Sequence, residues 1–385
     1  MHTILDEAER LGTFVGRIWR AEHHGPSLVS LREGCLVDIT SRRSPTMRDL
    51  LQLDEPVDYA KTTDGEVLGT IDSIAQSTLL DTAEAKSSLL APCDLQAIKA
   101  CGVTFARSMI ERVIEEKAAG DPARAERIRS YVTDIIGDSL SKLEAGSDRA
   151  AQVKQALIEE GLWSQYLEVG IGPDAEVFTK SQPMSAVGYG ADIGLHPVSR
   201  WSNPEPEIVL AVNGDGRIMG ATLGNDVNLR DVEGRSALLL GKAKDNNASC
   251  AIGPLIRLFD DTYSLDDVRQ ADLDLLVQGN DDYQLKGKSS MQEISRHPVD
   301  LVSQTCGRHH QYPDGFMLFL GTLFVPVDDR EVSGEGFTHK IGDIVYISND
   351  RLGTLQNTVK YCTDCAPWQF GFSDLMRNLA KRNLL

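Results

Sequence analysis

The sequence predicts an α+β protein in which a small N-terminal α/β domain precedes a larger mixed β-roll or barrel. Two observations carry this prediction. The first ninety residues mix short strand-like runs with turn residues, and from Gly170 onward short apolar runs are separated by Gly, Pro, Asn and Asp. Such spacing is typical of a rolled, largely antiparallel sheet rather than of repeated βαβ units. We therefore expect an N-terminal domain at residues 1–90 and a larger β-rich domain at residues 91–385.

The individual elements follow from local patterns. In the N-terminal part, strands are expected at 12–19, 26–32 and 34–40, where β-branched and aromatic residues are bounded by turn residues. Residues 108–167 have apolar positions at three- and four-residue spacing with glycines at the ends, which predicts a helical segment. Beyond it, the apolar runs that predict strands are 175–180, 207–212, 217–224, 316–326 and 343–348.

Composition excludes several classes of function. A formal charge of -18 over 385 residues opposes non-specific binding to nucleic acid or to an anionic membrane, because both need a basic surface. No apolar run approaches the roughly 20 residues that cross a bilayer, and the acidic start does not resemble a signal peptide, so we expect a cytoplasmic protein. Seven irregularly spaced cysteines predict free thiols, and Cys362 and Cys365 lack the second ligand pair of a structural zinc site.

An unusual pair of acidic residues begins the strand at 207–212. Glu205 and Glu207 are two residues apart and so project to the same face, while Pro206 between them suits the start of a strand. The N-G-D-G turn at 213–216 predicts a hairpin, which returns Asp226 to a position opposite Asn203 and within about two residues of Glu205. Three carboxylates are therefore expected to converge.

The spacing leaves two interpretations of these carboxylates open. A hard divalent ion such as Mg2+, Mn2+ or Ca2+ would relieve their repulsion with oxygen ligands. Alternatively, they are solvated strand ends that pair with Arg217, Arg230 or Lys180.

Two neighbouring segments favour a catalytic metal site. Residues 175–180, A-E-V-F-T-K, place Glu176 and Lys180 on one strand face, and G-K-A-K-D-N-N at 241–247 supplies Lys244. A lysine near a metal can act as an electrophile, and a glutamate outside the ligand set can act as a base. Surface ion pairing remains the alternative for each of these residues taken singly.

The order of these motifs resembles the fumarylacetoacetate hydrolase family over roughly residues 90–360. The motifs are A-E-V-F-T-K, E-P-E, N-D-V-N-L-R-D, K-D-N-N-A-S-C-A-I-G-P, G-T-L-F-V-P and L-G-T-L-Q-N. Within the family, the chain is most similar to the dehydratases of 2-keto-3-deoxy sugar acids. The resemblance implies a divalent cation, most simply Mg2+, on Glu205, Glu207 and Asp226, with Lys244 and Glu176 as catalytic residues. It also implies a 2-keto-3-deoxy-pentonate as the small-molecule partner, 2,5-dioxopentanoate as product, and a homodimer or homotetramer.

The chain departs from the hydrolases of that family at one motif. Their N-Y-x-x-H histidine has no counterpart in C-G-V-T-F-A-R-S at 101–108, where Arg107 and Ser108 could bind a substrate, unless Ser108 merely caps a helix. Lys180 and Thr354 are further substrate-binding candidates, and residues 306–315 are a candidate lid. The alternatives are a hydrolase or decarboxylase of acylpyruvate- or oxaloacetate-like acids, and a non-catalytic ligand-binding protein.

Overall fold

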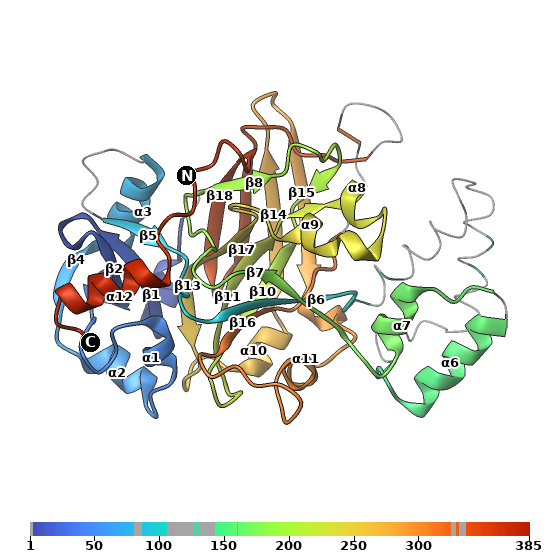
Figure 1. Cartoon of the computed structure of the whole chain (residues 1–385), viewed down its shortest axis with the longest axis horizontal. Coiled ribbons are helices and arrows are strands. Elements are labelled where there is room, and N and C mark those ends of the chain that lie inside the picture. The colour runs from blue at the N-terminus through green and yellow to red at the C-terminus, as the bar shows by residue number, and fades with distance from the viewer. Residues whose placement is uncertain are drawn as a thin grey trace.

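The computed structural model describes residues 3–80, 87–105, 109, 127, 130, 143–159, 161–324, 329–330 and 336–385. Within them, two mixed sheets occupy the centre, an N-terminal unit covers one side, and a pair of helices projects on the other (Figure 1). None of the helices in these ranges is both long and apolar enough to cross a bilayer. The chain is therefore a mixed α+β protein.

The larger sheet runs in the order β4-β3-β2-β1-β13-β11-β10-β16-β6-β7, and β5 pairs with β1. Its strands are β1 (Phe14–Arg20), β2 (Gly25–Arg32), β3 (Cys35–Asp38), β4 (Glu66–Thr70), β5 (Ser87–Leu90), β6 (Ala97–Gly102), β7 (Glu176–Ser181), β10 (Pro206–Val212), β11 (Ile218–Asp226), β13 (Cys250–Leu258) and β16 (Phe316–Phe319). The segments expected at 12–19, 26–32, 34–40, 175–180, 207–212 and 217–224 thus form strands of this sheet, but the strand expected at 316–326 ends at Phe319. β16 pairs with β6 in parallel, a non-local contact that local patterns do not reveal.

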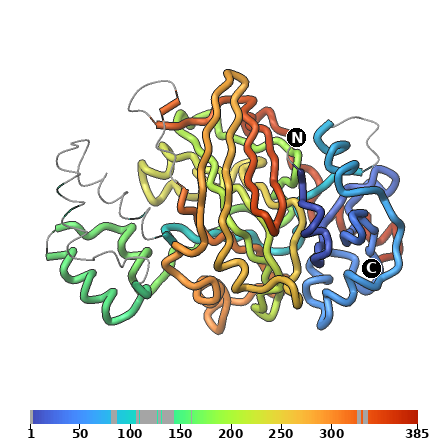
Figure 2. The backbone as a smooth tube through the Cα atoms, turned by 180° about the vertical axis from the view of Figure 1, so that it is seen from behind, coloured from blue at the N-terminus to red at the C-terminus, as the bar shows by residue number. Residues whose placement is uncertain are grey.

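A five-stranded sheet, β15-β14-β17-β18-β8, lies in front in the reverse view (Figure 2). Its strands are β8 (Asp192–Leu195), β14 (Asp272–Gln278), β15 (Gln284–Ser290), β17 (Ile344–Asn349) and β18 (Gly353–Tyr361). A short pair, β9 (Ser202–Asn203) with β12 (Asn228–Leu229), completes the described sheets.

The main core fills the space between the two larger sheets. Alternate residues of β10, β11 and β13 enter it, including Leu210, Leu223 and Leu255, together with Leu275 and Leu355 from the facing sheet. The opposite face of the larger sheet is covered as well, since a second cluster joins its strands to the N-terminal helices. Burial on both faces explains why β10 is apolar from residue 208 to residue 212 instead of alternating.

The helices lie around this core. They are α1 (Met47–Leu51), α2 (Pro56–Thr62), α3 (Ile71–Leu80), α6 (Asp148–Glu159), α7 (Gln165–Ile171), α8 (Arg230–Glu233), α9 (Leu240–Lys244), α10 (Leu265–Arg269), α11 (Pro298–Thr305) and α12 (Phe372–Lys381). The expected helical segment at 108–167 lies largely outside the described residues, but α6 falls within it and α7 begins at its end.

The N-terminal unit is closely joined to the rest of the chain. β1 pairs with β13 in the larger sheet, and the C-terminal helix α12 packs beside β2. There Asn378 donates hydrogen bonds from Nδ2 to the carbonyl oxygens of His23, at 2.8 Å, and His24, at 3.0 Å. A division of the chain at residue 90 stays a prediction.

The hairpin of β10 and β11 forms as expected, but in a different register. Pro206 faces Asn225 and Glu207 faces Gly224, so that Asp226 lies opposite Glu205 rather than Asn203. The shift arises because the turn closes between the backbones of Asn213 and Arg217 and because the ladder is irregular at the end of β10. As a result, the acidic residues lie closer together than the predicted register would place them.

Candidate metal and catalytic site

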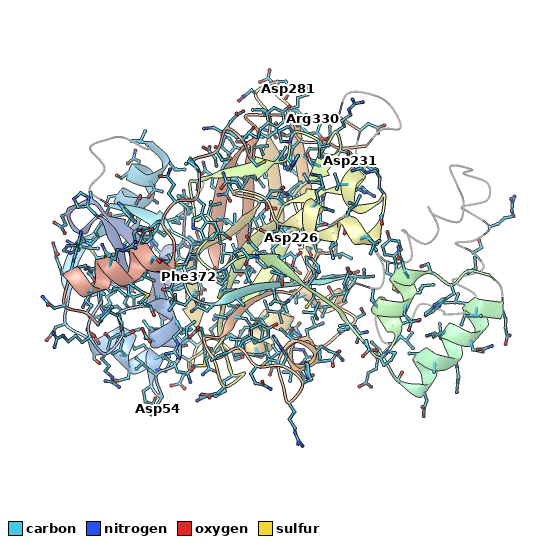
Figure 3. The ribbon with its side chains drawn as sticks, in the orientation of Figure 1. Asp54, Asp226, Asp231, Asp281, Arg330 and Phe372 are labelled. Atoms are coloured by element: carbon cyan, nitrogen blue, oxygen red, sulfur yellow. The ribbon has the colours of Figure 1, made fainter. Side chains whose placement is uncertain are left out.

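Three buried carboxylates meet at the end of the β10–β11 hairpin. Oxygen atoms of Glu205, Glu207 and Asp226 all lie within 4.8 Å of one another. The exposed fractions of the three residues are 7%, 1% and 2%. Figure 3 places Asp226 in the middle of the molecule, whereas Asp54 and Asp281 lie at its edges. Solvated strand ends are therefore excluded as an explanation of the acidic cluster.

Backbone contacts hold the two sides of this cluster together. The amide of Asp226 donates to the carbonyl oxygen of Glu205 at 3.1 Å, and the amide of Glu205 donates to Oδ1 of Asn225 at 3.1 Å. Across the sheet, the amide of Gly321 donates to Oε2 of Glu207 at 2.6 Å. Each carboxylate is thus held in place by a neighbouring strand or by the segment that follows one.

Two buried lysines offset most of the negative charge. Lys244, at the end of α9, places Nζ 2.6 Å from Oε2 of Glu205 and 3.0 Å from Oδ2 of Asp226. Lys180, on β7, places Nζ 2.9 Å from Oδ1 of Asp226 and donates to the carbonyl oxygen of Lys244 at 2.6 Å. With all five groups ionised, three carboxylates and two ammonium groups leave one negative charge in a buried site.

The pKa values reflect this imbalance. Burial, with the charges of Asp226 and Glu205, raises the pKa of Glu207 well above its usual value. Burial also raises the pKa of Glu205, although Lys244 opposes it, whereas the two lysines overcome burial and lower the pKa of Asp226. Burial would lower the pKa of Lys244, but Asp226 and Glu205 raise it well above its usual value. Glu207 is therefore the group with the least compensation.

A hard divalent cation fits this donor set. The three candidate ligands offer only carboxylate oxygens, which Mg2+, Mn2+ and Ca2+ prefer over nitrogen or sulfur. A dication would turn the single negative charge into a single positive one, which a substrate carboxylate would neutralise. Among the described residues, only these three form such a group, and Cys362 and Cys365 do not.

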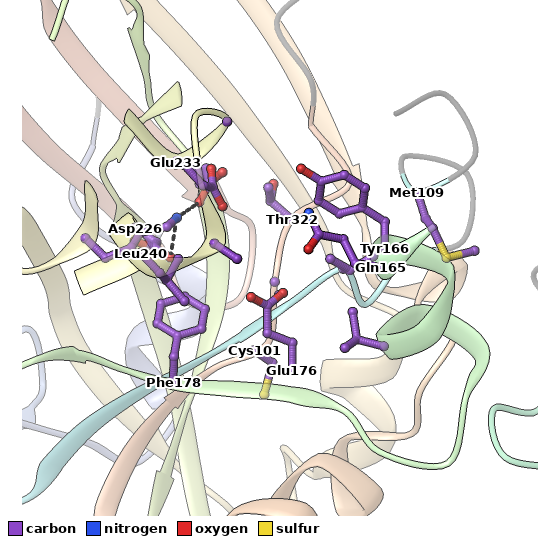
Figure 4. Close-up of a pocket in the computed structure, with 18 of the residues that line it drawn as sticks. Cys101, Met109, Gln165, Tyr166, Glu176, Phe178, Asp226, Glu233, Leu240 and Thr322 are labelled. Carbon is purple, nitrogen blue, oxygen red and sulfur yellow. Dashed lines mark hydrogen bonds and ion pairs between the residues drawn. The ribbon is translucent and has the colours of Figure 1, made fainter. Parts of the chain in front are cut away.

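A cavity of about 350 Å³ opens onto the carboxylates, and Figure 4 shows it from within. Its lining includes Glu176 and Phe178 of β7, Glu233 to Ala237, Leu240 and Lys244 around α8 and α9, Gly321 and Thr322 after β16, Gln165, Tyr166 and Val169 of α7, and Cys101 to Val103 with Met109. Glu176 lies on this cavity although it is not part of the acidic triad. A Cβ atom at Gly102 would lie 2.1 Å from Oε2 of Glu176, so a larger residue there would displace that carboxylate from its position.

The structure brings some of the remaining predicted residues to the cavity, but not others. Lys180 is fully buried behind Asp226, where it binds carboxylate and carbonyl oxygens. Thr354 lies in β18, its amide donates to the carbonyl oxygen of Ile4 at 2.9 Å, and it does not line the cavity described above. Arg107 and Ser108 lie outside the described residues. Substrate binding by these four residues stays a prediction.

The expected lid at residues 306–315 is wrong for this cavity. The loop meets the turn of the β10–β11 hairpin, where a Cβ atom at Gly214 would lie 2.5 Å from the carbonyl oxygen of Pro313. That turn is at the opposite end of β10 from Glu205. The sequence indicated an exposed polar loop. Because this loop contacts the turn of the hairpin and the carboxylates lie at the other end, it does not cover them.

Two polar residues of the site escaped the sequence analysis. Asn228 donates from Nδ2 to Oε1 of Glu205 at 3.0 Å and to Oε2 of Glu233 at 2.7 Å, and so links the cluster to a further carboxylate on α8. Both residues belong to the N-D-V-N-L-R-D-V-E segment that follows Asp226. Only the chain reversal after β11 shows that Glu233 reaches the cavity and that Asn228 reaches Glu205.

Comparisons with known proteins identify related sequences and a family. The model of the family described as "Fumarylacetoacetate (FAA) hydrolase C-terminal" matches residues 168–360. A Haloferax volcanii protein, described as a probable 2-keto-3-deoxyxylonate dehydratase, is 28% identical over 284 residues, which cover 74% of this chain and 92% of that protein. The 2-dehydro-3-deoxy-D-arabinonate dehydratase of Saccharolobus solfataricus is 32% identical over 188 residues, which cover 48% and 58% of the two chains.

Solved structures share the fold. A 2-keto-3-deoxy-D-arabinonate dehydratase complexed with magnesium and 2,5-dioxopentanoate matches with a TM-score of 0.63 at 21% identity, over 90% of this chain and 99% of that one. A fumarylacetoacetate hydrolase from Exiguobacterium antarcticum matches with a TM-score of 0.54 at 16% identity, over 91% and 99% of the two chains. At these identities the likeness concerns the fold alone.

Metal binding can be tested through stability. Mg2+ is expected to raise the melting temperature of protein stripped with a chelator, because a ligand that binds only the folded state stabilises it, by about 2.7 kcal/mol at a hundredfold excess over its Kd. Glu207→Gln should lose most of this shift, since it removes one of three anionic donors. Calorimetry with and without Mg2+ measures both, and Glu159→Gln on exposed α6 serves as the matched control. A full shift in Glu207→Gln would contradict the assignment.

The metal-free protein should also respond to pH through Glu207. Because its folded pKa is raised, its contribution to stability is present below the unfolded pKa and is lost as the pH rises through the folded value, by up to about 1.4 kcal/mol per pH unit. Burial lowers the pKa of His339, which gives the opposite slope. The free energy of unfolding of wild type minus that of Glu207→Gln, measured from pH 5 to 9 in chelator, cancels the histidine and should decrease with pH. A difference in free energy of unfolding that does not change with pH would show that the pKa of Glu207 is not raised in the folded protein.

Proposed function

The chain belongs to the fumarylacetoacetate hydrolase family, and on this premise we propose that it is a metal-dependent dehydratase of 2-keto-3-deoxy sugar acids. The proposed substrate is a 2-keto-3-deoxy-pentonate, and the proposed products are 2,5-dioxopentanoate and water. Similarity to the two dehydratases described above supports this choice over other activities of the family.

One observation carries the proposal, namely that Glu176 shares the cavity with the acidic triad without belonging to it, whereas Glu233, the other lining carboxylate outside the triad, is linked to the triad through Asn228. Glu176 reaches the cavity from β7, whereas the triad is built on β10 and β11 and is partly neutralised by Lys244. A dehydration next to a ketone requires both an electron-withdrawing site and a separate base. The cavity offers these two functions on different elements.

Glu205, Glu207 and Asp226 would hold the cation. When bound there, a divalent ion polarises the 2-oxo group of a chelated 2-keto acid and so acidifies the protons on C3. Lys244 supplies a fixed positive charge beside the same oxygens, and placing charge in advance where negative charge develops is commonly a large catalytic effect. Lys180 keeps Asp226 in position from behind and stays out of the cavity.

Glu176 takes one proton from C3, and the electron pair of that C–H bond forms a C3=C4 double bond as the C4 hydroxyl leaves. The hydroxyl gains a proton and departs as water, and in this proposal Glu176 returns the proton that it has taken. A proton shift from C5 to C3 then gives the C4=C5 enol, which tautomerises to the C5 aldehyde. The sequence of steps needs no oxidant or reductant.

Hydrolysis or decarboxylation of acylpyruvate- or oxaloacetate-like acids is the alternative at the same metal. Hydrolysis calls for a group that activates water, such as the histidine of the N-Y-x-x-H segment. None of the described residues that line the cavity is a histidine, which supports dehydration. A purified protein that cleaves acylpyruvates but leaves 2-keto-3-deoxy-pentonates unchanged would reverse this choice.

Replacement of Glu176 and Lys244 separates catalysis from metal binding. Glu176→Gln should reduce turnover of a 2-keto-3-deoxy-pentonate by about 10²–10⁴-fold, because it removes the base and keeps the volume. Lys244→Met should reduce it by about 10²–10³-fold through loss of the fixed charge. Release of the semialdehyde product measures turnover.

Thermal shifts with Mg2+ provide the control for these two variants. Glu176→Gln should keep the shift of wild type, and Lys244→Met should show an equal or larger one, since the triad then lacks one of its two cations. Glu159→Gln should match wild type in both assays. Full turnover in Glu176→Gln and Lys244→Met would refute their catalytic roles. No turnover in the wild-type protein, with the Mg2+ thermal shift intact, would favour the third possibility, a non-catalytic ligand-binding protein.

A further inference from the structure

Helix α7 forms the wall of the cavity on the side opposite the acidic triad. We propose that Gln165 and Tyr166 on this wall bind the hydroxyl group at the far end of the substrate and thereby determine its preferred chain length. This inference rests on the proposed function, because it assumes a substrate whose carboxylate and 2-oxo group lie at the triad.

The order of groups across the cavity supports this assignment. Figure 4 shows Glu176 between the side that carries Asp226 and Glu233 and the side from which Gln165 and Tyr166 extend. A substrate that is held by C1 and C2 at the triad, and that loses a proton from C3 to Glu176, directs its remaining carbons toward α7. The C5 hydroxymethyl group is the part of a pentonate that would arrive there.

The chemistry of the α7 wall matches a hydroxymethyl group. The amide of Gln165 and the phenol of Tyr166 both donate and accept hydrogen bonds, as a hydroxyl does. Val169 and Met109, which line the same side, offer apolar contact to a carbon atom. Neither polar side chain carries charge, so the wall suits the neutral end of a sugar acid and leaves its carboxylate to the cationic end of the site.

The wall is also anchored firmly enough to discriminate between ligands. Ser164 caps the start of α7 through the amide of Leu167, and the helix packs on α6 in a small apolar cluster of its own. At its C-terminal end, the guanidinium of Arg296 donates to the carbonyl oxygens of Val169 at 2.8 Å and Gly172 at 2.7 Å. The side chain of Arg296 is only 2% exposed.

Arg296 is therefore a positioning residue for the wall. A cation that satisfies the last carbonyl groups of a helix stabilises that helix end, and the planar fork of an arginine presents its donors in a fixed geometry that the ammonium of a lysine does not reproduce. A third acceptor, the carbonyl oxygen of Asp174 at 3.2 Å, extends this contact to the segment that leads into β7. The anchor thus ties the α7 wall to the strand that carries Glu176.

Two acids that differ only at C5 test the proposal. Both 4,5-dihydroxy-2-oxopentanoate and 4-hydroxy-2-oxobutanoate have the carboxylate, the 2-oxo group and the C4 hydroxyl, but the second lacks the hydroxymethyl group. Their affinities are measured by calorimetry in Mg2+ on the Glu176→Gln protein, where turnover does not interfere. We expect the five-carbon acid to bind about tenfold more tightly, as a site built for a hydroxyl loses affinity when that hydroxyl is missing.

Adding Gln165→Ala or Tyr166→Phe to the Glu176→Gln protein should reduce the ratio of the two affinities to a value between about one and three. Only the binding of the five-carbon acid should become weaker. Gln155→Ala, on the exposed face of α6, is the matched control and should keep the tenfold ratio. Arg296→Lys should lower the ratio while the Mg2+ thermal shift stays unchanged, and an unaltered ratio there would remove its positioning role. Equal affinities for the two acids in the parent protein, or a ratio that neither wall variant changes, would overturn the inference.

Dehydration of both acids by the wild-type protein is measured in parallel. If the five-carbon acid binds more tightly but neither acid is dehydrated, the proposed function is refuted and the assignment of the wall is kept. Dehydration of both acids, with equal affinities for them, would refute the wall alone.

Discussion

The burial of three carboxylates beside one another is the constraint on which the rest of the site depends. Like charges at this separation, removed from water, repel one another strongly unless cations or protons compensate them. The chain supplies two ammonium groups, on Lys180 and Lys244, so one of the three negative charges of the triad has no counter-charge among these five groups. That deficit makes the site receptive to a dication, and the excess positive charge then makes it receptive to an organic acid.

The fold supplies this compensation from elements that are far apart in the sequence. β10 and β11 carry the acids, β7 carries Lys180, α9 carries Lys244, and the backbone amide of Gly321 follows β16. The larger sheet brings them together because β16 lies between β10 and β6, and β7 pairs with β6. The parallel pairing of β16 with β6 is therefore as important to the site as the acidic hairpin itself.

The sequence predicted the parts of this arrangement that are local. The alternation of Glu205, Pro206 and Glu207 and the N-G-D-G turn sufficed to predict converging carboxylates, because a hairpin is determined by neighbouring residues. Its register was off by two residues, since the side chain of Asn213 organises a wider turn by accepting from the amides of Asp215 and Arg217. The α7 wall depends on Arg296, more than a hundred residues away, and no spacing rule connects the two.

The division of the cavity between sheet and helix suggests how one family can serve several reactions. The acidic triad lies on paired strands whose hydrogen bonds and burial fix it, so in the proposed reaction a cation held there would polarise the ketone of any 2-keto acid in the same way. The outcome of the reaction would then depend on groups outside the triad, here Glu176 and a described lining without histidine. Under the inference above, choice of substrate would rest in turn on a helical wall with its own small core, anchored by the guanidinium of Arg296. Specificity could then change at α7 without disturbing the charge balance of the acidic triad.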